Sequence, residues 1–196
     1  MEKRTERQFE IIEAAGQILT EEGVHGLTTK KLAQRVGFSE SAIYRHFKSK
    51  EDIIISLLTY LSESMDERFS HLELDKLSPE EGLEALFMNQ LEFFSSRTHF
   101  VVAVFSDGLM EASDRINESI ARIMQVKMKH LMPLIKNGQQ KNVFTKAIPA
   151  EDLIHIVMGT FRLQMYKWRQ AHFDFDIERQ GKNMIISILT LIKTKQ

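Results

Sequence analysis

Basic and hydroxyl side chains are concentrated in one short segment of this chain, residues 28–50. The segment contains six Lys or Arg residues and a single acid, Glu40, whereas the chain of 196 residues carries a formal net charge of −1. Such a local excess of positive charge is typical of a surface that binds phosphate groups. The apolar spacing predicts two short helices separated by a turn at Gly37. This pattern indicates a helix-turn-helix, whose second helix enters the major groove of DNA.

Helices are predicted along nearly the whole chain, because apolar residues recur three and four positions apart and Pro and Gly are few. Thr28, Ser39, Ser49 and Ser78 are suited to cap helix N-termini, and Gly23 is suited to end the first helix. The stretch 99–112 is apolar nearly all round and suits a buried helix, although a strand is possible from propensity alone. The predicted fold class is all-α, with helices at about 5–22, 28–36, 39–47, 50–72, 79–96, 99–112, 114–138, 149–171 and 176–194.

The segment 27–50 resembles the N-terminal DNA-binding domain of the tetracycline-repressor (TetR) family of bacterial regulators. The motifs that carry the resemblance are Leu-Ala-x-x-Val-Gly, Ser-x-Ser-x-Ile-Tyr-x-His-Phe and Ser-Lys-Glu, and the similarity extends to roughly residues 8–55. The rest of the chain resembles the family only in its length and helical character. The resemblance implies a three-helix DNA-binding domain at residues 1–48. A fourth helix would join it to a helical ligand-binding and dimerisation domain at residues 49–196, giving about nine helices.

The same resemblance implies which side chains contact DNA. Tyr44 and His46 resemble the family's pair of phosphate contacts on the recognition helix. Thr29 lies at a helix N-terminus, which is a natural phosphate site, and Lys50 would reach a flanking phosphate. Base edges would be read by Lys, Arg, Glu and Ser side chains on the groove side. The expected DNA-binding set is Thr28, Thr29, Lys30, Ser39, Glu40, Ser41, Tyr44, Arg45, His46 and Lys50.

A ligand pocket is expected in the second domain, where aromatic and Met side chains recur. Most such residues form the core of a helical protein, but a few polar groups among them could orient a ligand. Arg162 is the most suggestive, since it lies within an apolar run; it could pair with a ligand carboxylate or with Asp107 or Glu111. The expected effector is a small apolar or amphipathic molecule. The candidate ligand-binding residues are Phe87, Gln90, Phe94, Phe105, Met110, Phe161, Arg162, Met165 and Trp168.

A homodimer is predicted through the last two helices. Each has a broad apolar face, and Gly159 would allow another helix to approach closely. Two such faces fit a four-helix interface, although they could instead pack on the core of their own domain. A palindromic operator in double-stranded DNA requires two DNA-binding domains about 34–36 Å apart, which favours the dimer.

Several other classes of protein are disfavoured. The chain has no Cys, no His cluster with metal-ligand spacing, no phosphate-binding loop and no nucleophile motif, so we expect no cofactor, no metal and no enzymatic activity. The N-terminus is charged, and no run of 18 uncharged apolar residues occurs. We therefore expect a cytoplasmic protein that does not interact with membranes.

The predicted function is a sequence-specific DNA-binding transcriptional regulator, and most simply a repressor released by a small-molecule ligand. The ligand would favour a dimer whose heads no longer match the operator, with the change carried by the fourth helix. One alternative is a DNA-bound adaptor or nucleoid-associated factor with the same head and no small-molecule inducer. Another is a helical enzyme that retains a vestigial head.

Overall fold

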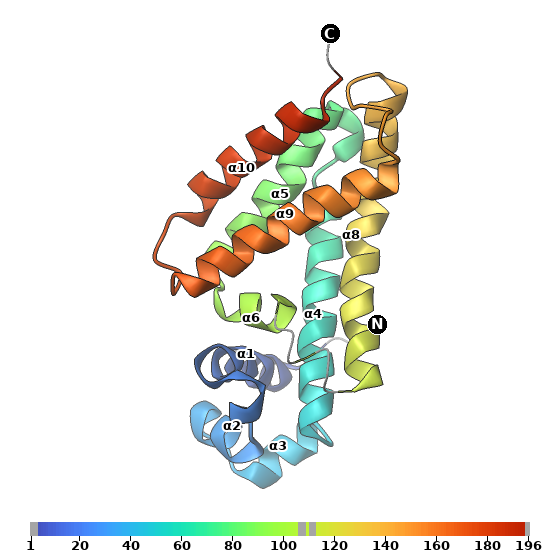
Figure 1. Cartoon of the computed structure of the whole chain (residues 1–196). Coiled ribbons are helices and arrows are strands. Elements are labelled where there is room, and N and C mark those ends of the chain that lie inside the picture. The colour runs from blue at the N-terminus through green and yellow to red at the C-terminus, as the bar shows by residue number, and fades with distance from the viewer. Residues whose placement is uncertain (1–3, 106–108, 110–112, 195–196) are drawn as a thin grey trace. The chain divides into compact units, whose positions relative to one another are not determined.

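The computed structural model describes residues 4–105, 109 and 113–194, and this part of the chain is all-α, as predicted (Figure 1). The helix expected at 99–112 is described as far as Phe105. None of the described helices is both long enough and apolar enough to cross a membrane. The elements are α1 (Glu6–Gly26), α2 (Thr29–Val36), α3 (Glu40–His46), α4 (Lys50–Ser70), the 3₁₀ helix η1 (Leu74–Lys76), α5 (Pro79–Ser95), α6 (His99–Phe105), α8 (Asp114–Gln140), α9 (Ala150–Gln170) and α10 (Ile177–Ile192).

Side-chain caps determine where several of these helices begin. Thr28, Ser39, Ser49 and Ser78 each accept a hydrogen bond from the backbone N–H three residues later, as their positions predicted. In α5 the cap is reciprocal, because the Glu81 carboxylate accepts from the Ser78 N–H at 2.9 Å. A cap of this kind stabilises a helix by about 1 kcal/mol.

The end of α1 differs from the prediction. Gly23 has a φ of 72° and does interrupt the helix, but a further helical turn follows as far as Gly26. A positive φ is readily adopted only by glycine, which explains why the interruption falls at this residue.

The described helices belong to two compact units. Unit 1 comprises Met1–Ser62 and His99–Ile123, and unit 2 comprises Glu63–Thr98 and Met124–Gln196. The division falls inside α4 and α8, so each of these helices contributes to both units. The functional boundary expected between residues 48 and 49 stays a prediction.

In unit 1, α1 packs against α2, α3 and α6. Figure 1 shows α1, α2 and α3 grouped beside the first turns of α4. Ile12, Leu32, Ile43 and Phe100 are fully buried in this core. Gly16 lets α1 approach α6 closely, because a Cβ there would lie 2.9 Å from the His99 ring.

In unit 2, α10 packs against α5 and α9, which run beside it in Figure 1. A Cβ at Gly181 of α10 would collide with the Leu91 side chain of α5. The end of α4 is tied to α8 in this unit, since Asp66 pairs with Lys129 and His130 at 2.8 and 2.7 Å. The two pairs hold the pKa of the Asp66 carboxyl below its ordinary value, with Lys129 as the larger cause.

Candidate DNA-binding surface and ligand cavity

The turn between α2 and α3 sets the orientation of the helix that carries most of the predicted contacts. Gly37 adopts the left-handed conformation, with φ 71° and ψ 29°, and its N–H donates to the Ala33 carbonyl. Leu32 of α2 and Ile43 of α3 are fully buried, which fixes the inner side of each helix. The outer side of α3 is consequently turned toward solvent, as the sequence predicted.

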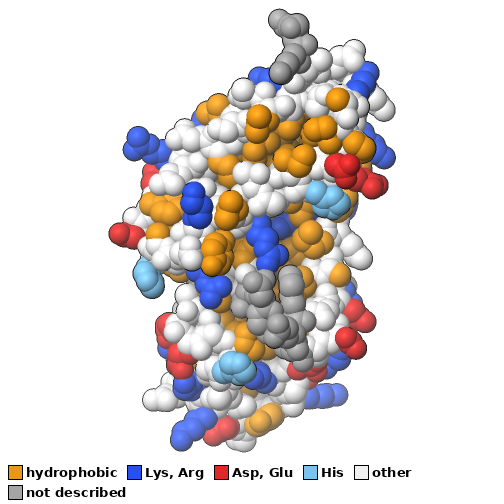
Figure 2. Space-filling model, in the orientation of Figure 1, with side chains coloured by type: hydrophobic (Ala, Val, Ile, Leu, Met, Phe, Trp, Pro, Cys, Tyr) orange, Lys and Arg blue, Asp and Glu red, His pale blue; other side chains and the backbone are white. Residues whose placement is uncertain are grey.

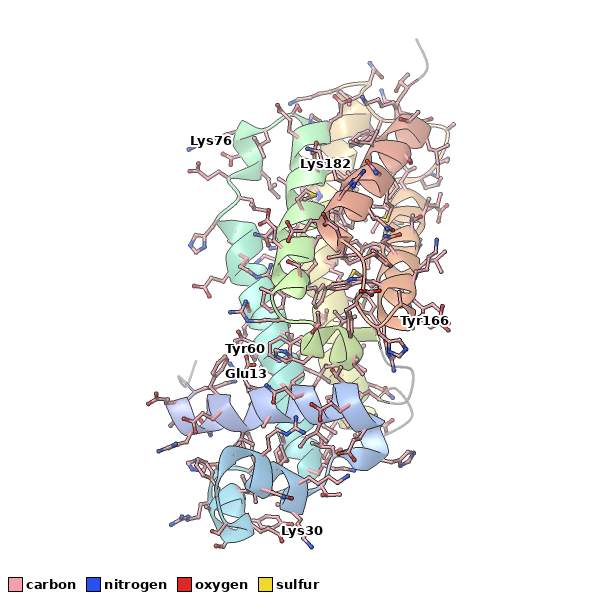
Figure 3. All side chains as sticks on the ribbon, turned by 90° about the vertical axis from the view of Figure 1, so that its left-hand side faces the viewer. Glu13, Lys30, Tyr60, Lys76, Tyr166 and Lys182 are labelled. Atoms are coloured by element: carbon pink, nitrogen blue, oxygen red, sulfur yellow. The ribbon has the colours of Figure 1, made fainter. Side chains whose placement is uncertain are left out.

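Every residue of the predicted DNA-binding set lies at the surface of unit 1. Thr29 and His46 are half-buried, and the others are exposed, with 54% of the Tyr44 side chain accessible. Lys30 points away from the helices of the unit in Figure 3. The side chains of the set are therefore accessible to a large ligand.

A hydrogen bond joins α2 to α3 within this surface. The Thr29 and Tyr44 hydroxyl groups lie 3.2 Å apart, so the first residue of α2 and the middle of α3 present hydroxyl groups at one point. Ser39 caps α3 and lies 2.9 Å from the Ser41 hydroxyl. Hydroxyl and backbone N–H donors grouped at helix N-termini are suited to hold phosphate oxygens.

Some basic side chains of the segment are engaged within the unit. Arg35 forms a two-point ion pair with Glu21 of α1, at 2.8 and 2.5 Å, and Lys31 pairs with Glu22. The Arg35 pair lowers the pKa of the Glu21 carboxyl. These exposed pairs link the surfaces of α2 and α1.

The acids beside Lys50 are also engaged. Arg115, near the start of α8, contacts Glu51 at 2.6 Å and Asp52 at 2.8 Å. Arg115 and then Ser49 lower the pKa of the Asp52 carboxyl. Both carboxylates next to Lys50 are thereby turned to Arg115, and Lys50 is exposed at the first turn of α4.

Unit 2 contains a small cavity between α4, α5, α8 and α9, with a volume of about 30 Å³. A space of this size holds about one or two water molecules. Its polar lining residues are Gln90 and Lys127. The apolar lining residues are Phe69, Leu86, Phe87, Leu131, Met158 and Phe161.

The two polar residues of the cavity wall have defined surroundings. Arg68 donates to the Gln90 side-chain oxygen at 3.3 Å and lies 4.1 Å from the centre of the Phe93 ring. Gln90 itself is only 6% exposed. Burial, and then the nearby charge of Arg162, lowers the pKa of Lys127 to about 8.

The candidate ligand residues are dispersed. Phe87, Gln90 and Phe161 line the cavity. Arg162 is exposed on α9, and its positive charge contributes to the lowered pKa of Lys127.

The other candidates do not line this cavity. Phe94, Met165 and Trp168 are buried in unit 2, where the Trp168 indole N–H donates to the Phe175 carbonyl at 2.9 Å. Phe105 belongs to unit 1. Met110 lies outside the described residues, as do Asp107 and Glu111, the alternative partners considered for Arg162.

The sequence reasoning missed Lys127, together with part of the apolar wall. A signal was available, because Lys127 lies four residues from Ile123 and four from Leu131, which are both 4% exposed. A single Lys in the apolar stripe of an amphipathic helix indicates a buried cation. The remaining residues that were missed are Phe69, Leu86 and Met158. The sequence pattern does not distinguish them from ordinary core residues.

Exposed apolar side chains follow one side of α9 and continue onto α10. Hydrophobic side chains gather over these helices in Figure 2, and Tyr166 points outward from α9 in Figure 3. Among the residues that the structure describes, apart from the adjacent residues and the nearby backbone of α9, no atom lies within 4 Å of a Cβ built at Gly159, which shares the exposed side of α9. The large exposed residues, with their exposed fractions, are Ile156 (47%), Leu163 (58%), Tyr166 (48%), Ile186 (51%) and Leu191 (78%).

Comparison with known proteins gives consistent results. The profile of bacterial regulatory proteins of the tetR family matches residues 11–57. The chain is 30% identical over 154 residues to the nucleoid occlusion factor SlmA of Vibrio campbellii, covering 78% of this chain and 77% of that protein. It is 21% identical over 195 residues to a fatty acid metabolism regulator protein of Bacillus subtilis, covering 100% of both. The crystal structure of FadR from Bacillus subtilis in complex with stearoyl-CoA has the same fold, with a TM-score of 0.83 at 19% identity over 94% of this chain and 98% of that one.

Proposed function

The chain belongs to the TetR family of bacterial transcriptional regulators, and we propose that it acts as a repressor released from DNA by a small amphipathic molecule bound in unit 2. It is a DNA-binding regulator, and the family is not one of enzymes. The observation that carries the ligand part of the proposal is the cavity in unit 2, with its aromatic wall and its cationic side chain. Since bacterial DNA lies in the cytoplasm, we expect the protein there.

The proposed DNA contacts divide into two kinds. Thr29, Tyr44, His46 and Lys50 would hold phosphates, which position the protein but carry no base information. The hydrogen bond between Thr29 and Tyr44 supports this assignment, because it sets hydroxyl groups of two helices side by side, and the group that accepts in this bond keeps its own O–H for a phosphate oxygen. Lys30 and polar side chains of the exposed side of α3 would read base edges in the major groove.

The ligand class is supported by both the cavity and the relatives. The wall contains the rings of Phe69, Phe87 and Phe161 together with the polar groups of Gln90 and Lys127, a combination that suits an apolar body with a polar end. FadR of Bacillus subtilis, which shares the fold, binds stearoyl-CoA. We propose that the effector of this chain is likewise a molecule with a long apolar part.

The size of the cavity supports a mechanism by population shift. Ligand sites for small molecules enclose roughly 300–1,000 Å³, whereas this cavity encloses about 30 Å³. A ligand would therefore bind a conformation in which the walls have moved apart, and it would favour that conformation over the present one. A coupling free energy of about 1–3 kcal/mol between ligand and operator binding would change operator affinity about 5–150-fold.

We also propose that the protein is a homodimer through α9 and α10. The apolar side chains exposed on these helices, among them Leu163 and Leu191, would be buried against a second copy. Gly159 supports this, because a Gly inside a helix costs about 1 kcal/mol relative to Ala, and within the described part of the chain no close neighbour requires a Gly at this position. A close approach of the partner helix would explain the absence of a side chain.

A second candidate function is favoured by one observation. The similarity to SlmA, a nucleoid occlusion factor, favours the alternative in which this chain is a DNA-bound adaptor. Mapping the protein on the chromosome by immunoprecipitation and sequencing distinguishes the two. A few palindromic sites beside promoters are expected for the repressor, whereas many dispersed sites away from promoters would support the adaptor.

A further inference from the structure

The start of α4 carries two acids directly after the predicted phosphate contact, and the phosphates of DNA would repel both. Glu51 and Asp52 follow Lys50 in the first turn of the helix. We infer that Arg115 of α8 is a positioning residue for operator binding, which holds these two carboxylates away from the DNA phosphates. This inference rests on the DNA-binding surface of the proposed function and adds a residue that lies outside the helix-turn-helix.

The first support is the set of contacts between the start of α8 and the start of α4, which lie side by side in Figure 1. One terminal nitrogen of Arg115 donates to Glu51 Oε2 at 2.6 Å, and the other donates to Asp52 Oδ1 at 2.8 Å. The Ser113 hydroxyl donates to the second oxygen of Glu51. A planar guanidinium group can hold two carboxylates in a fixed direction, which the point charge of a Lys does not do.

The second support is that Asp52 is held from two sides. The Ser49 hydroxyl donates to Asp52 Oδ2 at 2.9 Å and accepts from the Asp52 N–H at 3.1 Å. Arg115 and then Ser49 lower the pKa of the Asp52 carboxyl, so this group is charged at neutral pH. Both oxygens of each carboxylate therefore accept from donors at the starts of α4 and α8. Lys50 is exposed and is not one of these donors.

Loss of Arg115 would change the charges that the start of α4 presents to DNA. Glu51 and Asp52 would each lose a cationic partner, and the nearest cations in the sequence are Lys48 and Lys50. A carboxylate that pairs with Lys50 competes with phosphate for the same ammonium group, and one that stays unpaired repels the phosphate directly.

The effect is expected in operator affinity rather than in stability. The Arg115 side chain is 58% exposed, and ion pairs of such a side chain contribute little to the free energy of unfolding. Repulsion of a DNA phosphate, by contrast, acts whenever the operator is bound.

The test measures the affinity of the full-length protein for an operator fragment recovered from the chromosome, by fluorescence anisotropy. Arg115→Ala is expected to bind about fivefold more weakly than the wild type, which is the effect of one pair of unit charges at contact in a water-like dielectric. Arg122→Ala removes the same charge from an exposed position seven residues along α8 and should bind as the wild type does. Urea denaturation checks that both variants keep the stability of the wild type.

A double variant of the acids shows whether Arg115 acts through them. Glu51→Gln with Asp52→Asn removes both negative charges and is expected to bind the operator at least as tightly as the wild type. Adding Arg115→Ala to this double variant should cause no further loss, because no charged carboxylate is left to hold.

Three results would contradict the inference. In the first, Arg115→Ala binds as tightly as the wild type. In the second, it weakens binding equally with and without the two acids, so that Arg115 acts on DNA through its own charge. In the third, the double variant of the acids binds as weakly as Arg115→Ala, so that the ion pairs are needed to shape α4.

The proposed contact of Lys50 can fail separately from this inference. If Lys50→Ala binds as the wild type does while the Arg115 variants behave as expected, the inference stands and Lys50 is not a contact. If Lys50→Ala weakens binding and Arg115→Ala does not, the contact stands and the inference is wrong.

Discussion

The basic side chains of the helix-turn-helix in unit 1 are of two kinds, those paired with acids and those of the predicted DNA-binding set. Lys31 and Arg35 are paired with acids of α1, and an exposed ion pair of this type contributes little to stability. Lys30, Arg45 and Lys50 are the exposed basic side chains of the predicted DNA-binding set. The positive charge that the prediction assigns to DNA is therefore smaller than the count of basic residues in segment 28–50.

The phosphate contacts can be tested with one double variant. Tyr44→Phe with Lys50→Ala is expected to weaken operator binding and to reduce the salt dependence, log K against log salt, by about one unit. Fluorescence anisotropy over a range of salt concentrations measures both quantities. Lys76→Ala, which removes an exposed cation of unit 2 outside the predicted set, is the control. An unchanged salt slope in the double variant would contradict the assignment.

Lys127 makes a prediction about stability. Its pKa is 10.5 in ordinary surroundings and about 8 in the folded protein, so the unfolded chain binds more protons between these values. The free energy of unfolding of the wild type should therefore rise as pH increases from about 8 to about 10.5 through this group. Below pH 8 the full cost of burying the charge is present.

Lys127→Met is consequently expected to be the more stable protein at pH 7, by roughly 1–3 kcal/mol. The difference in the free energy of unfolding between Lys127→Met and the wild type should decrease as pH rises from about 8 to about 10.5. Deprotonation of Lys127 in this range removes the cost of burying its charge in the wild type, whereas Met carries no charge. Urea denaturation of both proteins at pH 7 and pH 10 gives the comparison, and Lys136→Met, at an exposed position of the same helix, should behave as the wild type does. A difference between wild type and Lys127→Met that is the same at both pH values would contradict the account.

At the scale of helices, most of the fold follows from local sequence. The expected starts of α2, α3 and α5 are confirmed because Thr28, Ser39 and Ser78 cap them through backbone N–H groups within the same turn. The observed end of α1 lies one turn beyond the predicted end, because Gly23 interrupts the helix and a further helical turn follows. Local signals fix where a helix begins better than whether the chain returns to helix after a break.

The two candidate sites differ in how far the sequence could predict them. The recognition surface is formed by residues close together in the chain, so its exposed side could be read from helical spacing. The cavity brings together side chains of α4, α5, α8 and α9, and only their packing decides which aromatic residues reach it. Phe94 and Phe161 have the same character in sequence, yet only Phe161 lines the cavity.

The exposed side of α9 allows a test of the dimer. Gly159→Arg is expected to give a folded monomer, because a Cβ at this exposed position meets no atom of the surrounding described residues, whereas a long side chain there would obstruct a partner helix. Sedimentation equilibrium measures the association, and circular dichroism checks the fold. Gly159→Ala is the graded variant, in which the added methyl group weakens the dimer less than Arg does, while the helix itself gains about 1 kcal/mol. A dimer of wild-type affinity in Gly159→Arg would place the interface elsewhere.

At the scale of the whole molecule, the account joins two functions in one chain. The helix-turn-helix of unit 1 determines where on DNA the protein binds. A ligand in the cavity of unit 2 would determine when the protein dissociates from DNA. α4 and α8 contribute residues to both units, and Lys50, Glu51 and Arg115 lie where these helices begin. Movement of the cavity walls would therefore involve helices that also position a DNA contact.

The most direct test is the affinity of the full-length protein for an operator recovered from the chromosome, measured by fluorescence anisotropy as decanoate is titrated. The account predicts that operator affinity falls at least about fivefold when the cavity is saturated. Operator affinity that stays constant while calorimetry shows the ligand to be bound would contradict release by ligand.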